Sequence, residues 1–162
     1  MLLGITGDTH NNLSNISEIC KLFNFHEVEI VIHTGDITLA KSLEAFSDLN
    51  MPLIGVFGNN DIGEKAELKK TANKIGFKIF EEPHLVALGE LKILIFHHPD
   101  IINKGHIESV DAIFHGHTHR FRQELVNETL IFNPGECAGL LKGKNRIGLY
   151  ETKTKEAKTI SF

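Results

Sequence analysis

Residues 2–10 read LLGITGDTH, a short apolar run that gives way at once to glycine, aspartate and histidine. Four later segments repeat the pattern of a strand-length apolar run followed by polar residues: VIHTGD (31–36), GVFGNND (55–61), LIFHH (94–98) and IFHGHTH (113–119). In open α/β sheets, ligands gather in the crevice beyond the carboxyl ends of the strands. One Gly-Asp or Gly-Asn pair is an ordinary turn sequence, but five such strand ends, all carrying side chains that bind metals, predict one shared site.

The first half of the chain alternates strand and helix patterns. Apolar residues recur at the spacing of one helix face between the β-branched runs, as Ile16, Ile19, Cys20 and Phe23 illustrate. The predicted elements are strands at 2–6, 29–33 and 52–57 and helices at 14–25, 39–49 and 64–75, with Gly76 as the C-cap of the last helix. Strand–helix–strand units of this length imply a parallel sheet with short connections.

The second half changes character and consists mostly of short strand patterns separated by turns. These predicted strands lie at 78–80, 85–88, 91–96, 112–115, 124–126, 129–132, 147–151 and 157–160, and only residues 101–110 have a helical pattern. We therefore expect α/β units followed by a mostly antiparallel part. Because no linker or repeat separates the halves, residues 1–162 are predicted to form a single α/β domain.

Composition narrows the classes of function. Lys and Arg number 17 against 21 Asp and Glu, a net charge of −4 that argues against nonspecific nucleic-acid binding. The cysteines Cys20 and Cys137 are far apart, as expected for unpaired thiols in a reducing compartment. The N-terminus resembles no signal peptide, and no apolar run approaches the ~20 residues of a membrane helix. We expect a cytoplasmic protein without a membrane partner.

The polar side chains at the strand ends form a mixed set of oxygen and nitrogen donors. Without thiolates, such a set suits Mn, Fe, Zn, Ni or Co. Seven donors exceed what one such ion takes from protein, and they suit two ions about 3.5–4 Å apart that share one carboxylate. The candidate metal ligands are the oxygen donors Asp8, Asp36 and Asn59 and the nitrogen donors His10, His97, His117 and His119.

Local spacing supports this set of ligands. His117 and His119 are two residues apart, so in an extended segment both side chains point the same way and one loop serves both ions. Asp8 and His10 have the same spacing. We expect the glycine before each motif to let the backbone turn sharply without a Cβ in the way.

These blocks resemble the calcineurin-like metallophosphoesterase superfamily, whose pattern is D-x-H, GD, GN-x-[DE], a lone H and GH-x-H. All five blocks are present in order between residues 8 and 119. The compact length, GNND and the later Asn133-Pro134-Gly135-Glu136 are similar to the small, single-domain YfcE-type phosphodiesterase branch. The resemblance implies a four-layer α/β/β/α sandwich of two mixed β-sheets flanked by helices, with the NPGE loop beside the metal site.

The resemblance also implies a mechanism. Asp8, His10, Asp36 and His119 would hold the first divalent metal, and Asp36 would bridge to a second held also by Asn59, His97 and His117. A hydroxide bridging the two ions would attack the phosphorus in line, and both ions would neutralise the transition state. Mn is the first expectation for the metal, with Ni, Fe, Zn or Co as alternatives, and a small phosphodiester or other phosphate ester is the expected substrate.

The chain departs from the family pattern at Asn60. Many members carry histidine there, where it stabilises the transition state or protonates the leaving group, whereas an amide delivers no proton at neutral pH. We hypothesise a preference for esters with good leaving groups, such as aryl phosphodiesters. Asn60 and Asp61 are the candidate catalytic residues, although Asp61, with no histidine to orient, has helix capping as its alternative.

The remaining candidates have structural explanations beside functional ones. His33 either orients a ligand or is a buried, hydrogen-bonded strand histidine, and His115 is expected to pack or to support the site. Strand alternation would turn His98 away from the site, although His97 and His98 compete for the same ligand position. Arg120 and Arg122 are expected to be solvated charges rather than phosphate contacts. The phenylalanines expected in the core are Phe23, Phe25, Phe46, Phe57 and Phe96.

Two other functions are compatible with the motifs. A non-catalytic protein-binding scaffold exists in the same family as a retromer subunit, but a scaffold has no need of seven chemically matched ligands. A phosphomonoesterase acting on nucleotides would share the metal chemistry and differ only in its substrate pocket. The sequence leaves the natural substrate and the oligomeric state open.

Overall fold

The computed structural model describes residues 1–162 and contains two β-sheets. The four strands β1 to β4 are parallel neighbours, and β10 and β11 extend the sheet antiparallel beyond β1. The strand order is β11 (Glu156–Ser161), β10 (Arg146–Glu151), β1 (Leu2–Thr6), β2 (Ile30–His33), β3 (Leu53–Val56) and β4 (Lys78–Phe80). The parallel sheet predicted from the first half of the chain is confirmed.

The second sheet is mixed rather than simply antiparallel. Its centre is a parallel trio, β6, β7 and β9, and each edge strand pairs antiparallel with its neighbour. The order is β5 (His84–Leu88), β6 (Leu91–Ile95), β7 (Ala112–Phe114), β9 (Thr129–Asn133) and β8 (Arg122–Val126). Because β6 and β7 are parallel, the histidine segments that follow them leave the sheet at the same edge.

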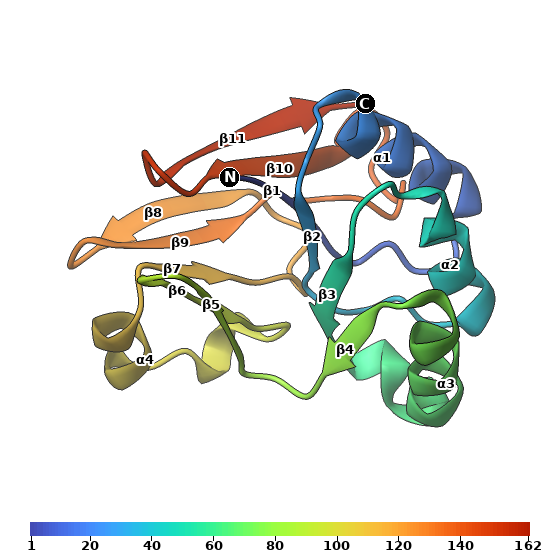
Figure 1. Ribbon diagram of the computed structural model, residues 1–162, viewed down its shortest axis with the longest axis horizontal. Helices are drawn as coiled ribbons and strands as arrows, with labels where there is room; N and C mark the ends of the chain where they lie inside the picture. The colour runs from blue at the N-terminus through green and yellow to red at the C-terminus, as the bar shows by residue number, and fades with distance from the viewer.

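Helices cover the outer face of each sheet (Figure 1). Helices α1 (Leu13–Phe25), α2 (Ala40–Glu44) and α3 (Lys65–Ile75) lie on the first sheet, and α4 (Lys104–Ser109) lies on the second. Three short 3₁₀ segments, η1 (Ala45–Asp48), η2 (Asn59–Glu64) and η3 (Pro99–Ile101), complete the helical parts. The four-layer α/β/β/α arrangement expected from the motifs is confirmed.

Three apolar layers hold these elements together. The largest fills the space between the first sheet and α1 to α3, with Phe23 and Phe46 fully buried. The second lies between the sheets, where Ile5 and Ile32 of one sheet meet Phe114 and Phe132 of the other. A smaller third layer lies under α4. Burial of apolar area at about 25 cal/mol per Å² is the main source of stability here.

Local signals explain where the helices begin and end. The side chain of Asn12 caps α1 by accepting a hydrogen bond from the Asn15 N–H at 3.1 Å. Helix α3 ends at Gly76 in the left-handed conformation, with φ of 78°, as predicted. The predicted helix at 39–49 is α2 followed by η1, so that segment tightens to 3₁₀ geometry in its second half.

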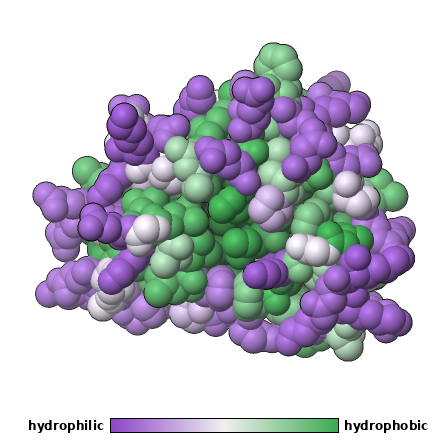
Figure 2. Space-filling model, in the orientation of Figure 1, coloured by the Kyte–Doolittle hydropathy of each residue, from purple (hydrophilic) through white to green (hydrophobic).

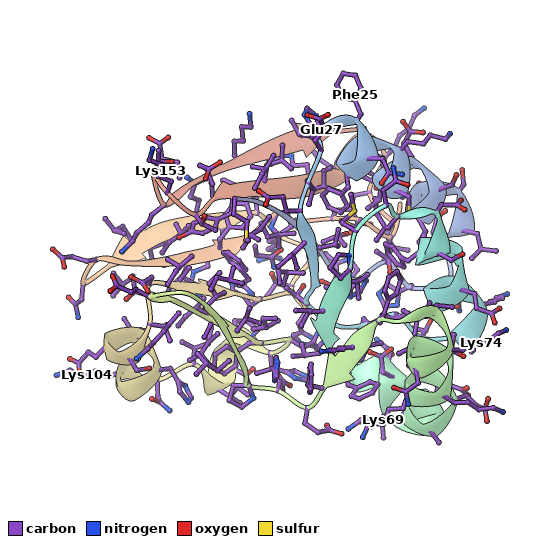
Figure 3. The ribbon with its side chains drawn as sticks, in the orientation of Figure 1. Phe25, Glu27, Lys69, Lys74, Lys104 and Lys153 are labelled. Atoms are coloured by element: carbon purple, nitrogen blue, oxygen red, sulfur yellow. The ribbon has the colours of Figure 1, made fainter.

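One expected core residue lies outside. Phe25 is 79% exposed and projects from the end of α1 (Figure 3). Lys69, Lys74 and Lys104 project from the surface in the same figure, from α3 and α4. Two residues along a helix turn a side chain by about 200°, so Phe25 lies opposite the buried Phe23. The prediction of a core role for Phe25 was therefore wrong.

Figure 2 shows one face of the molecule, in the orientation of Figure 1. Hydrophilic side chains lie around its edge, and apolar side chains gather across its middle. No helix is long and apolar enough to cross a membrane.

Candidate metal centre

The structure brings all seven predicted metal ligands together at one edge of the sandwich. They follow β1, β2 and β3 of the first sheet and β6 and β7 of the second, so both sheets supply donors. We call Asp8, His10 and His119 the first ligand group and Asn59, His97 and His117 the second, with Asp36 between them. Donor atoms within each set Asp8–His10–His119 and Asp8–Asp36–His97 lie within 4.8 Å of one another.

The first ligand group joins residues more than a hundred positions apart. His119 Nε2 lies 3.7 Å from Asp8 Oδ1 and 3.5 Å from His10 Nε2, and the two imidazole rings stack. Asp8 is buried, whereas His10 and His119 are half-buried. This group therefore has one interior anchor and two side chains that face the opening.

The second ligand group has the same plan. His97 is fully buried and its Nε2 lies 2.9 Å from Asn59 Oδ1 and 3.3 Å from His117 Nδ1. Asn59 and His117 are exposed and approach each other at 3.0 Å. The interior anchor in this group is an imidazole instead of a carboxylate.

Asp36 faces both groups with different oxygens. Its Oδ2 lies 3.9 Å from His10 Nε2, and its Oδ1 lies 3.5 Å from His97 Nε2. The carboxylate is nearly fully buried, between the two sets of donors. This position allows one carboxylate to serve two ions.

Hydrogen bonds on the far side of two rings fix where their lone pairs point. His97 Nδ1 lies 2.9 Å from the Thr34 carbonyl oxygen, which only accepts, so this nitrogen carries the proton. His119 Nδ1 lies 2.6 Å from Glu136 Oε2 and donates in the same way. The Nε2 atom of His97 then faces Asn59 Oδ1, and that of His119 faces Asp8 Oδ1. Imidazole nitrogens and oxygens directed at one another in this way fit a divalent transition metal.

Burial acts in opposite directions on the two anchors. Burial raises the pKa of Asp8 to about 7; the neighbouring Asp36 adds to this, while His119 and the His117 N–H oppose it. Burial lowers the pKa of His97, against the pull of Asp36, and keeps that ring neutral. Burial therefore favours the uncharged form of both anchors. Neutral imidazole is the form that binds a metal, whereas a carboxyl group binds a metal only after it loses its proton.

The backbone turns sharply at the ligands themselves. Five of the seven ligands have φ between 46° and 69°, the left-handed region that is strained for residues with a side chain: Asp8, His10, Asp36, His117 and His119. Among the glycines that precede these ligands, Gly35 has positive φ. Gly58 does not, and a Cβ there would overlap the Asp36 carboxylate. A Cβ on Gly116 would lie 2.7 Å from Asp8 Oδ2. The expectation that the glycines make the turns was thus incomplete, because they also make room for side chains of the site, and at Gly58 and Gly116 these are carboxylates.

Asp61 and Asn60 both bind the loop that carries Asp36. Asp61 is fully buried, and its carboxylate accepts backbone N–H bonds from Gly58 at 2.7 Å, Asp36 at 3.0 Å and Thr38 at 2.6 Å. Asn60 is exposed, and its side-chain amide donates to Asp36 Oδ2 at 2.7 Å. Asp61 therefore caps η2 and ties two ligand loops together, while Asn60 stands at the open side of Asp36.

His33 and His115 lie behind the site. The Gly35 N–H donates to His33 Nδ1 at 3.2 Å, so His33 Nε2 carries the proton and donates to Thr9 Oγ1 at 3.0 Å. Burial lowers the pKa of His33 to about 3 and that of His115 to about 4. Both rings are therefore neutral at pH 7. Both explanations of His33 hold: it is a buried strand histidine, and its hydrogen bonds also hold the loops that carry ligands.

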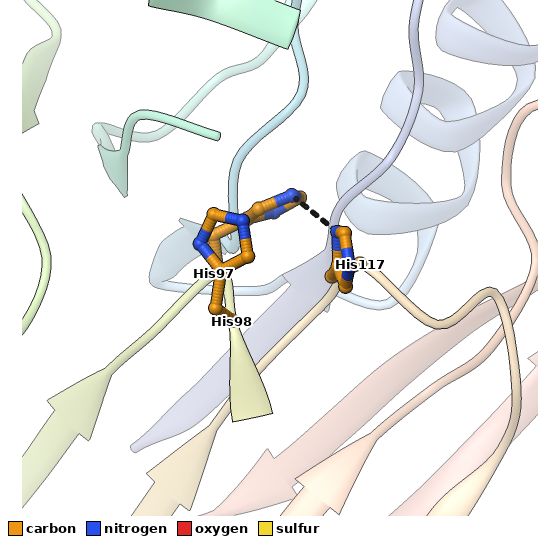
Figure 4. Close-up of side chains that lie close together, drawn as sticks. All are labelled: His97, His98 and His117. Atoms are coloured by element: carbon orange, nitrogen blue, oxygen red, sulfur yellow. Dashed lines mark hydrogen bonds between the residues drawn. The ribbon is translucent and has the colours of Figure 1, made fainter. Parts of the chain in front are cut away.

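Strand alternation predicted that His98 points away from the site, and this prediction was wrong. Strand β6 ends at Ile95, so His98 lies beyond the paired strand, where alternation no longer fixes the direction of a side chain. The rings of His97, His98 and His117 lie side by side (Figure 4), with 4.6 Å between the centroids of His98 and His117. His98 Nδ1 is held by a short hydrogen bond to Glu82. Of the two neighbouring histidines, His97 occupies the inner position, with its Nε2 3.5 Å from Asp36 Oδ1 and 2.9 Å from Asn59 Oδ1.

Two carboxylates, Glu136 and Glu82, hold histidines of the site, and the sequence indicated only the first of them. Glu136, which holds His119, lies in the NPGE block, which the family resemblance placed beside the metal site. Glu82 holds His98 and accepts the backbone N–H groups of both His97 and His98 at 2.6 and 2.9 Å. No motif surrounds Glu82, so only the folded chain reveals it. Arg122 pairs with Glu124 at 2.6 Å on the surface, as expected for a solvated charge.

The chain is similar to known proteins over almost all of its length. A model of the calcineurin-like phosphoesterase superfamily domain matches residues 1–155. Phosphodiesterase MJ0936 of Methanocaldococcus jannaschii is 38% identical over 171 aligned positions, covering 99% of this chain and 98% of that protein. A solved archaeal phosphodiesterase superposes with a TM-score of 0.92 at 37% identity over 100% of both chains. The phosphoesterase Yfce of E. coli superposes with a TM-score of 0.74 over 99% of both chains, and at 20% identity it shows the fold alone.

These similarities agree with the five motifs and with the two-sheet architecture. The region that the family model matches includes every predicted metal ligand and every strand except β11. The chain therefore belongs to the calcineurin-like phosphoesterase superfamily, a family of hydrolases that act on ester bonds.

Proposed function

We propose that this phosphoesterase is a phosphodiesterase that depends on two divalent metal ions. Asp8, His10 and His119 would hold one ion, and Asn59, His97 and His117 the other, with Asp36 shared. The observation that carries the proposal is the placement of Asp36, whose Oδ2 faces His10 at 3.9 Å while its Oδ1 faces His97 at 3.5 Å. A single-ion site has no use for a carboxylate that faces two donor groups.

Two ions bound there would lower the pKa of a shared water and neutralise the oxygens of the phosphoryl group. The donor set of imidazoles, carboxylates and one amide, without thiolate, supports Mn²⁺ as the first choice, with Ni, Fe, Zn or Co also compatible. The chain's own contribution is to fix these donors. Glu136 and the Thr34 carbonyl orient His119 and His97, so their lone pairs already point inward.

Asn60 and Asp61 have separate proposed roles. Asn60 is exposed beside Asp36, and its amide donates a hydrogen bond to Asp36 Oδ2. When substrate binds, this amide would contact a phosphoryl oxygen. It delivers no proton, so the leaving group must depart unassisted by this residue. Asp61 is a positioning residue, because its three backbone contacts set the geometry of the Asp36 loop.

A small diester is the proposed substrate. The support is the relative of 38% identity that is named a phosphodiesterase, together with the missing proton donor at Asn60, which favours activated esters. We also propose that residues 1–162 act as one domain, since the ligands come from both sheets and the sheets share one apolar layer.

The test is hydrolysis of bis(p-nitrophenyl) phosphate with added Mn²⁺, together with metal analysis of the purified protein. We expect turnover, two metal equivalents per chain, and loss of both in Asp36→Ala. His117→Ala should lose turnover and one equivalent, while His26→Ala, remote from the site, serves as the matched histidine control. Metal content without turnover would support the scaffold, and faster turnover of p-nitrophenyl phosphate or nucleotides than of the diester would support a monoesterase.

A further inference from the structure

A small pocket opens beside the first ligand group. Its volume is about 180 Å³, and His119 forms one wall. The opposite side carries Phe121, Leu141, Lys144 and Arg146. We propose that this pocket, the His119 pocket, binds the substituent of a phosphodiester that does not leave, and that this substituent is an aromatic group with its own negative charge. The inference rests on the proposed phosphodiesterase activity and specifies its substrate.

Position links the pocket to the reacting phosphate. His119 separates the two spaces, because its Nδ1 side faces Glu136 of the pocket wall and its Nε2 faces Asp8 at 3.7 Å and His10 at 3.5 Å. A diester phosphate held at the ligand groups would therefore have one substituent directed past His119. The side chain of His119 is 21% exposed, so it is accessible to a ligand from outside.

Size and lining favour a single ring. A cavity of about 150 Å³ holds a benzene molecule, so about 180 Å³ admits one aryl group but not a second. Phe121 is 47% exposed and its ring is braced edge-on against Phe132 at 6.3 Å between centroids. The held ring of Phe121 and the side chain of Leu141 suit a flat apolar ligand.

Charge selects among aromatic ligands. Neither Lys144 nor Arg146 has a carboxylate partner in the structure, whose ion pairs involve other residues. The Arg146 guanidinium lies 5.7 Å from the centre of the Phe121 ring, over its face. The one acidic wall residue, Glu136, already uses Oε2 for His119 and Oε1 for the Leu140 N–H at 2.8 Å. Two free cations therefore remain for an anionic group at the rim.

The loop that forms the pocket is ordered by the same residue that orients His119. Beyond the two contacts of its carboxylate, the Glu136 carbonyl accepts the Arg146 N–H at 2.7 Å, which closes the loop between residues 136 and 146. The Lys144 N–H in turn donates to the Leu141 carbonyl at 3.0 Å. Pocket and metal ligand are thus positioned together, before any substrate arrives.

The larger cavity of the molecule does not compete for this role. It measures about 880 Å³ and lies between the edge strands β8 and β11, lined by residues such as Leu125, Leu130 and Lys158. None of its lining residues is a metal ligand, and both signs of charge occur in it. Its size alone does not connect it with phosphate chemistry.

The test compares two diesters that release the same p-nitrophenolate: bis(p-nitrophenyl) phosphate and 4-carboxyphenyl p-nitrophenyl phosphate. Because hydrogen bonds between charged groups are stronger than neutral ones, we expect the KM of the carboxylated ester to be roughly tenfold lower. Lys144→Gln and Arg146→Gln should each raise that KM towards the value for the uncharged ester. Phe121→Leu should raise the KM of both. Lys142→Gln, in the same loop but outside the pocket, is the matched control and should change neither.

Binding provides a readout that needs no turnover. Calorimetric titration of 4-carboxyphenyl phosphate into the metal-free protein should show binding that weakens about tenfold in Arg146→Gln and is unchanged in Lys142→Gln. Equal KM values for both esters in the wild-type protein, or equal effects of Lys142→Gln and Lys144→Gln, would overturn the pocket assignment while leaving the phosphodiesterase intact. Absence of turnover with both esters, with calorimetric binding preserved, would overturn the proposed function and not the pocket.

Discussion

The two ligand groups have the same plan but opposite anchors. Each has one buried donor and two donors at the opening, with Asp8 as the anchor of the first group and His97 as that of the second. Burial raises the pKa of the Asp8 carboxyl to about 7 and lowers the pKa of the His97 imidazole. The imidazole is therefore ready to bind a metal, whereas the carboxyl must first lose a proton that burial favours.

The difference shows how one environment affects two kinds of ligand. A cation bound in the first group would replace the proton of Asp8, so binding there would be coupled to proton release. In the second group no proton would leave His97. Asp36 connects the groups, and the residues around it decide whether they act as one site or as two.

The largest effect is expected from Gly58→Ala, which should disable both groups at once. The added Cβ would overlap the Asp36 carboxylate, the only donor that faces both groups. Several kcal/mol of lost transition-state stabilisation corresponds to a rate reduction of roughly 10³-fold or more. Steady-state hydrolysis of bis(p-nitrophenyl) phosphate measures it. Gly63→Ala, in the same segment with no atom within 4 Å of the new Cβ, is the control and should retain full activity. A fully active Gly58→Ala protein would contradict the shared role of Asp36.

Asn60→His tests the space between the two groups. The amide donates to Asp36 and delivers no proton, so the rate of the wild-type enzyme should depend steeply on the pKa of the leaving group. General acid catalysis contributes about 10²–10⁴-fold, so the histidine variant should gain roughly 10²-fold on poorly activated alkyl aryl diesters. A series of substituted phenyl esters measures the slope. A flat dependence in the wild-type enzyme would defeat this explanation.

Glu136→Gln should separate the groups. It replaces the carboxylate that orients His119 and leaves the contacts of His97 untouched. Loss of such a supporting partner typically reduces metal affinity about 10–100-fold, and here only one of the two bound equivalents should weaken. Competition with a chelator, followed by metal analysis, resolves the two equivalents. Equal weakening of both would mean that the groups do not bind independently.

The pH dependence of stability in the metal-free protein should have opposite signs for the two anchors. Unfolded Asp8 loses its proton near 3.8 and folded Asp8 near 7, so its contribution to the free energy of unfolding falls as pH rises through this window. Folded His97 stays neutral below 6.5, where the unfolded residue is protonated, so its contribution rises with pH up to that value. Urea unfolding with EDTA at about pH 5 and about pH 7.5 gives the slopes.

Matched variants isolate each contribution. Asp8→Asn should remove the falling component and His97→Gln the rising one, so the two variants should deviate from the wild-type protein in opposite directions. Each pKa unit corresponds to about 1.4 kcal/mol in the free energy of unfolding, a difference that urea titration measures. Deviations of the same sign would show that burial does not control the two anchors as described.

The sequence predicted the strands and most helices because their signals are local. Short apolar, β-branched runs marked β1 to β3, apolar residues at helical spacing marked the faces of α1 and α3, and Gly76 marked a helix end. The failures occurred where a local rule was extended past its element. Phe25 lies on the exposed face of the last turn of α1, and His98 lies beyond the end of β6, where alternation no longer applies.

The sequence by itself determined which donors exist and that they follow strands, because a strand end places its next side chains at a sheet edge. Tertiary structure alone decided which donors meet. The parallel pairing of β6 with β7 brings His97 beside His117, and the packing of two sheets places His119 against Asp8, 111 residues earlier. Glu82, the two faces of Asp36 and the His119 pocket have no local signal at all, since each depends on contacts between segments far apart in the chain.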